Sequence, residues 1–175
     1  MQAFLISGIP GAGKTTVARA LAARFPRAAH IEGDLVGEAF IVSGFVPPQG
    51  PPQDEAHRQL ALRRSNMRAL ADSFAAAGFV PVVDDVVVAP SVLGGYLDGL
   101  QCRPLLFVQL APSLDVVAQR DAARHKHFFE MWQHLDAELR AWPSEPGLWL
   151  DTSRLTVAET VSLILARSAE AVVAR

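Results

Sequence analysis

The sequence is poor in cysteine, has no excess of charge and lacks long apolar runs, and each scarcity excludes a class of protein. Cys102 is the only cysteine in 175 residues, which excludes an internal disulfide and a cysteine-based zinc cluster and favours a reducing, cytoplasmic compartment. A net charge of −2 does not favour extended binding to a nucleic acid backbone. No apolar run approaches the roughly 20 residues of a membrane span, and no secretory leader pattern precedes the first strand, so no membrane partner is expected.

The length and composition of the chain indicate a single domain. Half of the residues are hydrophobic and 19% are charged, which is enough for one sizeable core and too little chain for two ordinary domains. We therefore predict a single domain over residues 1–175. The even charge balance favours a small molecule as the binding partner, and the expected state is a monomer or homodimer.

Residues 8–15, Gly-Ile-Pro-Gly-Ala-Gly-Lys-Thr, match the phosphate-binding pattern G-x-x-x-x-G-K-[ST] at every fixed position. An apolar run precedes them and a helical pattern follows, as a P-loop requires. Successive backbone N–H groups and the helix N-terminus would bind ATP phosphates, Lys14 would reach the outer phosphates, and Thr15 would ligate Mg²⁺. The predicted nucleotide-binding residues are Gly8, Pro10, Gly11, Ala12, Gly13, Lys14, Thr15 and Thr16.

A second candidate position is Asp34, which follows a short predicted strand over residues 28–31. A carboxylate at the carboxyl end of a strand in an open α/β sheet can accept a proton from a substrate hydroxyl or hold metal-bound water. Glu32 could share this role. Asp34 could instead cap a helix over residues 35–41.

The proline-rich segment 44–52 and the helix predicted over residues 53–77 lie on the expected acceptor side. The segment is interpreted either as a substrate lid or as a rigid surface connection with no ligand contact. The helix carries Arg58, Arg63, Arg64 and Arg68, and one or two of these arginines could turn inward to an acceptor while the others stay solvated.

Residues 79–85 predict a buried strand that ends in Asp84 and Asp85, as expected for a Walker B carboxylate near Mg²⁺. Because strand side chains alternate between faces, only one of the two acids should point toward the metal. Further along, Arg120 and Arg124 stand four residues apart on one helical face. They could close over the transferring phosphoryl group, in a lid of about residues 120–130, or be a solvated pair.

The remaining pattern alternates strands with helices, including strands near residues 104–110 and 148–152 and a closing helix over residues 156–175. Right-handed crossovers between such units give a three-layer α/β/α domain with a five-stranded parallel sheet.

With the P-loop, Gly33-Asp34-Leu35, Val83-Asp84-Asp85 and the Arg120/Arg124 pair in this order, the chain resembles the small P-loop kinases of the nucleoside-monophosphate-kinase-like group. That group includes gluconate, shikimate, adenylylsulfate and chloramphenicol kinases. The resemblance implies strand order 2-3-1-4-5, an acceptor-side acid at Asp34 and lid arginines at Arg120 and Arg124.

The leading hypothesis is an ATP- and Mg²⁺-dependent phosphotransferase that acts on a hydroxyl of a small-molecule acceptor, a metabolite or an antibiotic. Its predicted catalytic residues are Lys14, Asp34, Arg120 and Arg124. Its predicted metal ligands are Thr15 and either Asp84 or Asp85. Two alternatives stay open. A regulatory or assembly NTPase would use the same P-loop without an acceptor, and a polynucleotide 5′-kinase would need a basic groove.

Overall fold

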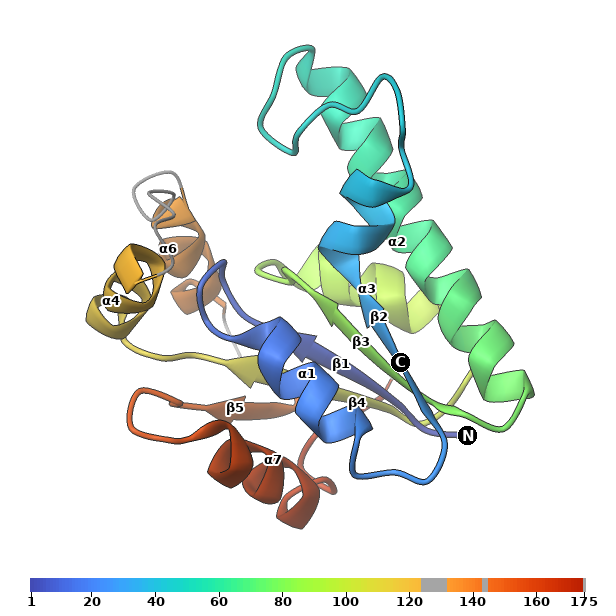
Figure 1. Ribbon diagram of the computed structural model, residues 1–175, viewed down its shortest axis with the longest axis vertical. Helices are drawn as coiled ribbons and strands as arrows, with labels where there is room; N and C mark the ends of the chain where they lie inside the picture. Colours follow the sequence, from blue (N-terminus) through green and yellow to red (C-terminus); the bar gives the residue numbers. More distant parts are fainter. Residues whose placement is uncertain (124–131, 143–144, 175) are drawn as a thin grey trace.

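The chain folds around a parallel sheet whose strand order is β2-β3-β1-β4-β5, as predicted (Figure 1). The structure is a computed structural model, and it describes residues 1–123, 132–142 and 145–174. The strands of this parallel path are β1 (Ala3–Ser7), β2 (Ala28–Glu32), β3 (Val80–Asp85), β4 (Leu105–Leu110) and β5 (Leu148–Leu150). The described helices between these strands are α1 (Lys14–Ala22), the π-helix η1 (Leu35–Ala39), α2 (Gln53–Ala76), α3 (Pro90–Gly99), α4 (Leu114–Ala123) and α6 (His134–Arg140), and α7 (Val157–Ala166) follows β5.

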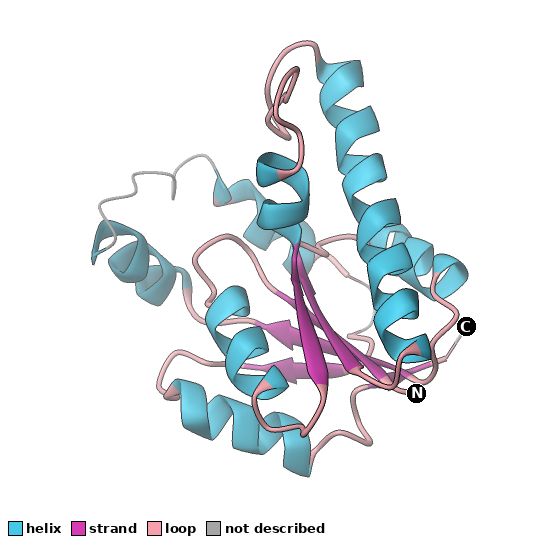
Figure 2. Cartoon of the chain, turned by 45° about the vertical axis from the view of Figure 1, so that its right-hand side comes forward, coloured by secondary structure: helices cyan, strands magenta, loops and turns pink. Residues whose placement is uncertain are grey.

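Alternation along the central strands divides the core between the two faces of the sheet. Phe4 and Ile6 of β1 pack with the residues of α1 and α7 on one face. Ala3 and Leu5 pack with the residues of α2 and α3 on the other face. The strands are therefore apolar on both sides, as expected for a parallel sheet that helices cover (Figure 2).

The end of the chain differs from the sequence prediction. The closing helix was expected to reach residue 175, but α7 ends at Ala166 and a short strand β6 (Val172–Val173) pairs antiparallel with the start of β4. β5 pairs only with Val108–Leu110, which leaves the backbone of the first half of β4 without a partner on that side. β6 supplies those hydrogen bonds, and unpaired buried backbone groups are costly enough to explain the turn away from helix.

Three of the predicted site segments lie at or just after the carboxyl ends of neighbouring strands. The P-loop follows β1, Asp34 follows β2, and Asp84 and Asp85 end β3 in register with Ile6 and Ser7. This edge is the usual ligand site of an open parallel sheet. Within the described part of the chain, no helix has the length and apolar character needed to cross a membrane.

Candidate active site

The P-loop connects β1 to the first turn of α1 and is shaped by its glycines. Gly11 and Gly13 have φ values of 87° and 98°, which side chains of L-residues rarely adopt. A Cβ atom on Gly11 would also stand 2.8 Å from Cγ1 of Val117 in α4. Gly8 and Ala12 are buried beneath the loop, while Pro10, Gly11, Gly13, Lys14, Thr15 and Thr16 line a pocket.

Lys14 lies in the P-loop with its ammonium group donating a hydrogen bond to the backbone carbonyl of Ile9 at 3.3 Å. Removal from water lowers the pKa of this ammonium group, and the nearby carboxylates of Asp84 and Asp34 offset only part of that effect. The cation is therefore short of compensating negative charge. An anionic phosphate beside it would supply that charge.

Asp84 points toward the P-loop and is held from two sides. Its Oδ1 atom lies 3.5 Å from the Thr15 hydroxyl, and its Oδ2 atom lies 2.6 Å from Nε2 of His30 on β2. A hydroxyl and a carboxylate next to a phosphate loop form an all-oxygen donor set, which fits Mg²⁺ and leaves the other positions to phosphate and water.

Asp85 faces the opposite side of the sheet, as the alternation of β3 requires. Its fully buried carboxylate accepts hydrogen bonds from Arg63 at 2.5 Å, from Arg64 at 3.1 Å and from the Tyr96 hydroxyl at 2.9 Å. Burial, followed by the charge of Asp85, raises the pKa of Tyr96 well above its usual value, so Tyr96 stays a neutral donor. The two adjacent acids thus have different partners.

Asp34 immediately precedes η1 and has a side chain that is 75% exposed. Its Oδ1 atom lies 3.5 Å from Nη1 of Arg63, so Arg63 stands between Asp34 and Asp85. Asp34 makes no capping hydrogen bond within η1, whose residues are all described, so the helix-capping interpretation does not hold. Arg63 and Arg64 are the arginines of α2 that turn inward, whereas Arg58 pairs with Asp54 and Glu55 at the surface.

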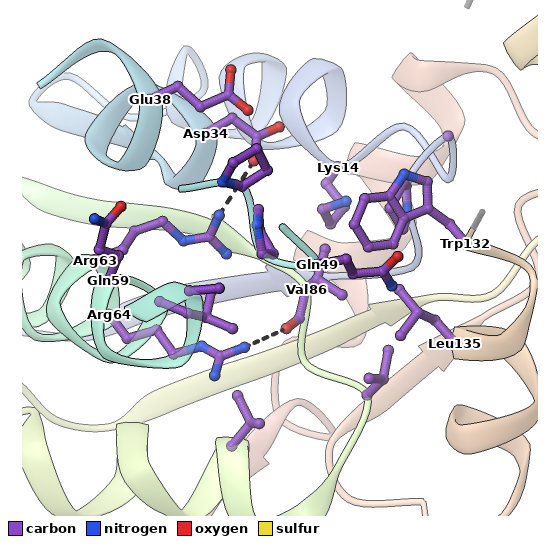
Figure 3. Close-up of a pocket in the computed structure, with 18 of the residues that line it drawn as sticks. Lys14, Asp34, Glu38, Gln49, Gln59, Arg63, Arg64, Val86, Trp132 and Leu135 are labelled. Carbon is purple, nitrogen blue, oxygen red and sulfur yellow. Dashed lines mark hydrogen bonds and ion pairs between the residues drawn. The ribbon is translucent and has the colours of Figure 1, made fainter. Parts of the chain in front are cut away.

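One pocket of about 830 Å³ is lined by the P-loop, Asp34, Arg63 and Arg64. Figure 3 shows Asp34, Arg63 and Arg64 along one side of it, Trp132 and Leu135 along the other, and Lys14 between them. Six of the eight predicted nucleotide residues and the predicted acceptor acid therefore line one continuous space. Ligand pockets commonly have volumes of roughly 300–1,000 Å³.

The proline-rich segment lines the same pocket, and α2 holds it in place. The side-chain amide of Gln59 accepts from the backbone N–H of Val46 at 2.9 Å and donates to the carbonyl of Gly44 at 2.8 Å. Gln49 lies 3.3 Å from His134 of α6, across the pocket from α2. The segment is thus anchored to α2 and lines the pocket, and its role as a substrate lid stays a prediction.

Arg120 lies beside the P-loop, where its guanidinium donates to the carbonyls of Ala12 and Thr152, both at 3.2 Å. It therefore joins the P-loop to the segment after β5. Arg124 and most of the predicted lid lie outside the described residues.

Sequence reasoning did not single out His30, Gln59, Tyr96 or Trp132 for the site. His30 carried a signal, because it precedes Asp34 by four residues on a strand whose carboxyl end reaches the site. The other three come from positions that only the tertiary structure brings together, and no local motif marks them.

Comparisons with known proteins agree with this geometry. A family model described as AAA domain matches residues 5–141. No curated protein matches the chain. Among solved structures, a sugar kinase from Janibacter sp. HTCC2649 is 22% identical with a TM-score of 0.73, covering 98% of this chain and 96% of its own.

Two other solved structures cover nearly the whole chain. The tunicamycin resistance protein of Deinococcus radiodurans is 20% identical, with a TM-score of 0.69 and 99% of both chains covered. A gluconokinase from Sinorhizobium meliloti 1021 is 22% identical, with a TM-score of 0.65, covering 96% of this chain and 91% of its own. From the match over residues 5–141, the chain belongs to the AAA domain family, and its fold is that of small P-loop kinases.

Proposed function

We propose that this protein is a kinase that transfers the γ-phosphate of ATP to a hydroxyl group of a small-molecule acceptor. The observation that carries the proposal is the continuous pocket between the P-loop lysine and the exposed carboxylate of Asp34. A nucleotide site alone would not need a second polar wall. Kinases bring donor and acceptor together in one space, and most of their catalysis is positioning and charge stabilisation.

In this proposal the P-loop N–H groups bind the β-phosphate, and Lys14 follows the charge of the transferring phosphoryl group. Asp34 accepts the proton of the acceptor hydroxyl as the acceptor oxygen forms its bond to phosphorus. The bond between the γ-phosphorus and the bridging oxygen breaks, and ADP leaves with that electron pair. Arg120, docked on the P-loop, adds positive charge beside the nucleotide.

Mg²⁺ is part of the proposal, with Thr15 and Asp84 as its protein ligands and Asp85 reserved for the two arginines. When bound, the ion would neutralise phosphate charge. His30 holds the free oxygen of Asp84 and thereby orients it.

The similar solved structures support this proposal, because they include proteins named as a sugar kinase and a gluconokinase. The single cysteine supports a cytoplasmic location, because a chain without disulfides has no need of an oxidising compartment.

The test measures ADP release with and without acceptors from a panel of sugars, nucleosides and alcohols. Asp34→Asn should lose the acceptor-stimulated rate by about 10²-fold or more, the usual value of a general base, while still binding ATP. Asp54→Asn is the matched control, because Asp54 is similarly exposed but pairs with Arg58 at the surface. ATP hydrolysis that no acceptor stimulates would favour an acceptor-independent NTPase instead.

A further inference from the structure

The acceptor end of the pocket has two walls of opposite chemistry. One wall is polar and contains Asp34, Arg63 and Arg64. Six apolar lining residues, here called the apolar wall, are Phe45, Val46, Pro48, Leu60, Trp132 and Leu135. Of these, Trp132 and Leu135 lie across the pocket from Arg63 and Arg64 (Figure 3). These six residues come from the proline-rich segment, α2 and the region of α6, so three separate parts of the chain place apolar groups around one space.

Four of the polar side chains that line the pocket already have partners within the chain. The side-chain amide of Gln59 forms hydrogen bonds with Gly44, Val46 and Glu55, and the side-chain amide of Gln49 forms one with His134. Arg63 and Arg64 are bound to Asp85. These four side chains therefore have little left to offer the extra hydroxyls of a fully hydroxylated acceptor, and hydroxyls that lose water without a new partner cost affinity.

The apolar wall is also pre-formed. The backbone N–H of Gly50 donates to the carbonyl of Pro47 at 2.7 Å, and Gln59 fastens the preceding residues to α2. Prolines at 47 and 48 fix φ along the same stretch. Binding of an apolar ligand group to this surface would therefore carry little entropy cost for ordering the segment.

From these contacts we propose that the acceptor is an alcohol whose reacting hydroxyl sits next to an apolar body, such as an aryl or alkyl group. The hydroxyl lies at Asp34 and the apolar body lies against the apolar wall. This inference rests on the proposed kinase function and narrows its acceptor to one chemical class. It separates the protein from a kinase for small, fully polar sugars or sugar acids.

The experiment compares acceptors that share a reacting group and differ in the apolar body. Glycerol is paired with 1-phenyl-1,2-ethanediol, and methyl β-glucoside is paired with phenyl and octyl β-glucosides. Phosphorylated product is measured directly, and binding to the ADP-bound protein is measured by calorimetry. Burying a phenyl group should favour the apolar member of each pair by about 10-fold or more in kcat/KM and in affinity.

Two matched pairs of variants locate the effect. Leu60→Ala and Phe45→Ala should remove most of the preference for the apolar member. Leu62→Ala and Phe40→Ala should leave it unchanged, because Leu62 on the same helix and Phe40 are exposed and outside the pocket lining.

Three results would overturn the inference. Polar members phosphorylated as well as their apolar partners would refute it and leave the kinase function standing. A preference that survives both pocket variants would place the apolar body elsewhere and refute the assignment to this wall. ATP hydrolysis with no phosphorylated product in any pair would count against the kinase function itself, and the acceptor class would fall with it.

Discussion

Asp85 offers the sharpest prediction from the structure, because its carboxylate is fully buried and compensates two arginines that are 10% and 20% exposed. Asp85→Asn keeps one acceptor oxygen but removes the negative charge. Breaking a buried ion pair from one side costs roughly 3–5 kcal/mol. We expect about 3 kcal/mol, at the lower end of that range, because Arg63 keeps Asp34 and Arg64 keeps the Val86 carbonyl as partners.

For a chain of this length, about 3 kcal/mol corresponds to a fall in Tm of roughly 6–12 °C. The assay is thermal unfolding of the nucleotide-free protein followed by circular dichroism. Asp84→Asn is the control and should lower Tm by less than about 4 °C, because it can still hydrogen-bond to His30. Adding Arg64→Met to Asp85→Asn should recover part of the loss, since it removes one uncompensated charge. An Asp85→Asn protein that melts within about 2 °C of wild type would refute this description of the cluster.

Three further predictions concern single side chains. Lys14→Met should abolish turnover yet raise the Tm of the nucleotide-free protein, because burial lowers the Lys14 pKa and keeping that ammonium group charged destabilises the wild-type fold. The stability of the wild-type protein should accordingly rise with pH between the lowered pKa of Lys14 and its ordinary value. An unchanged or lower Tm would contradict this. Arg120→Ala should lower kcat by about 10²-fold with a much smaller change in ATP affinity, and Arg120→Lys should rescue poorly; a lysine variant with more than about half of the activity would show that the guanidinium geometry is unimportant. Burial, with Asp72 nearby, raises the pKa of the Cys102 thiol from 9.0 to about 11. A disulfide reagent at neutral pH should therefore label Cys102 in the native protein at least about 100-fold more slowly than in the unfolded chain. Equal labelling rates would place the thiol at the surface.

The fold was largely predictable because its signals are local and repeated. The P-loop pattern, the apolar runs and the alternation of strands and helices each agree with the observed elements, and the resemblance supplied the confirmed strand order. The one clear error, a helix through residue 175, arose because the free edge of β4 is a tertiary feature. Val172 and Val173 have the β-branched side chains of a strand, yet their partner is almost 70 residues earlier in the chain.

Site residues that follow a strand could be predicted from the sequence. Site residues that face inward from a helix could not. Alternation correctly indicated that Asp84 and Asp85 point to opposite faces, but it could not say which acid meets the P-loop, because that depends on which face α1 covers. The arginines of α2 were similarly ambiguous, since α2 has only a weak amphipathic pattern and Arg63 and Arg64 are adjacent in sequence. Only the position of Asp85 below them distinguishes this pair from Arg58 and Arg68.

The most direct test of the account is the fate of the γ-phosphate, followed by ³¹P nuclear magnetic resonance during turnover with ATP, Mg²⁺ and the aryl and alkyl alcohols named above. If the pocket joins ATP to an alcohol, a phosphomonoester signal should grow in step with ADP, one for one, with little inorganic phosphate. That signal should be lost in Asp34→Asn. ADP that accumulates with an equal amount of inorganic phosphate, whatever acceptor is present, would contradict the central claim that this pocket joins a phosphate donor to an alcohol.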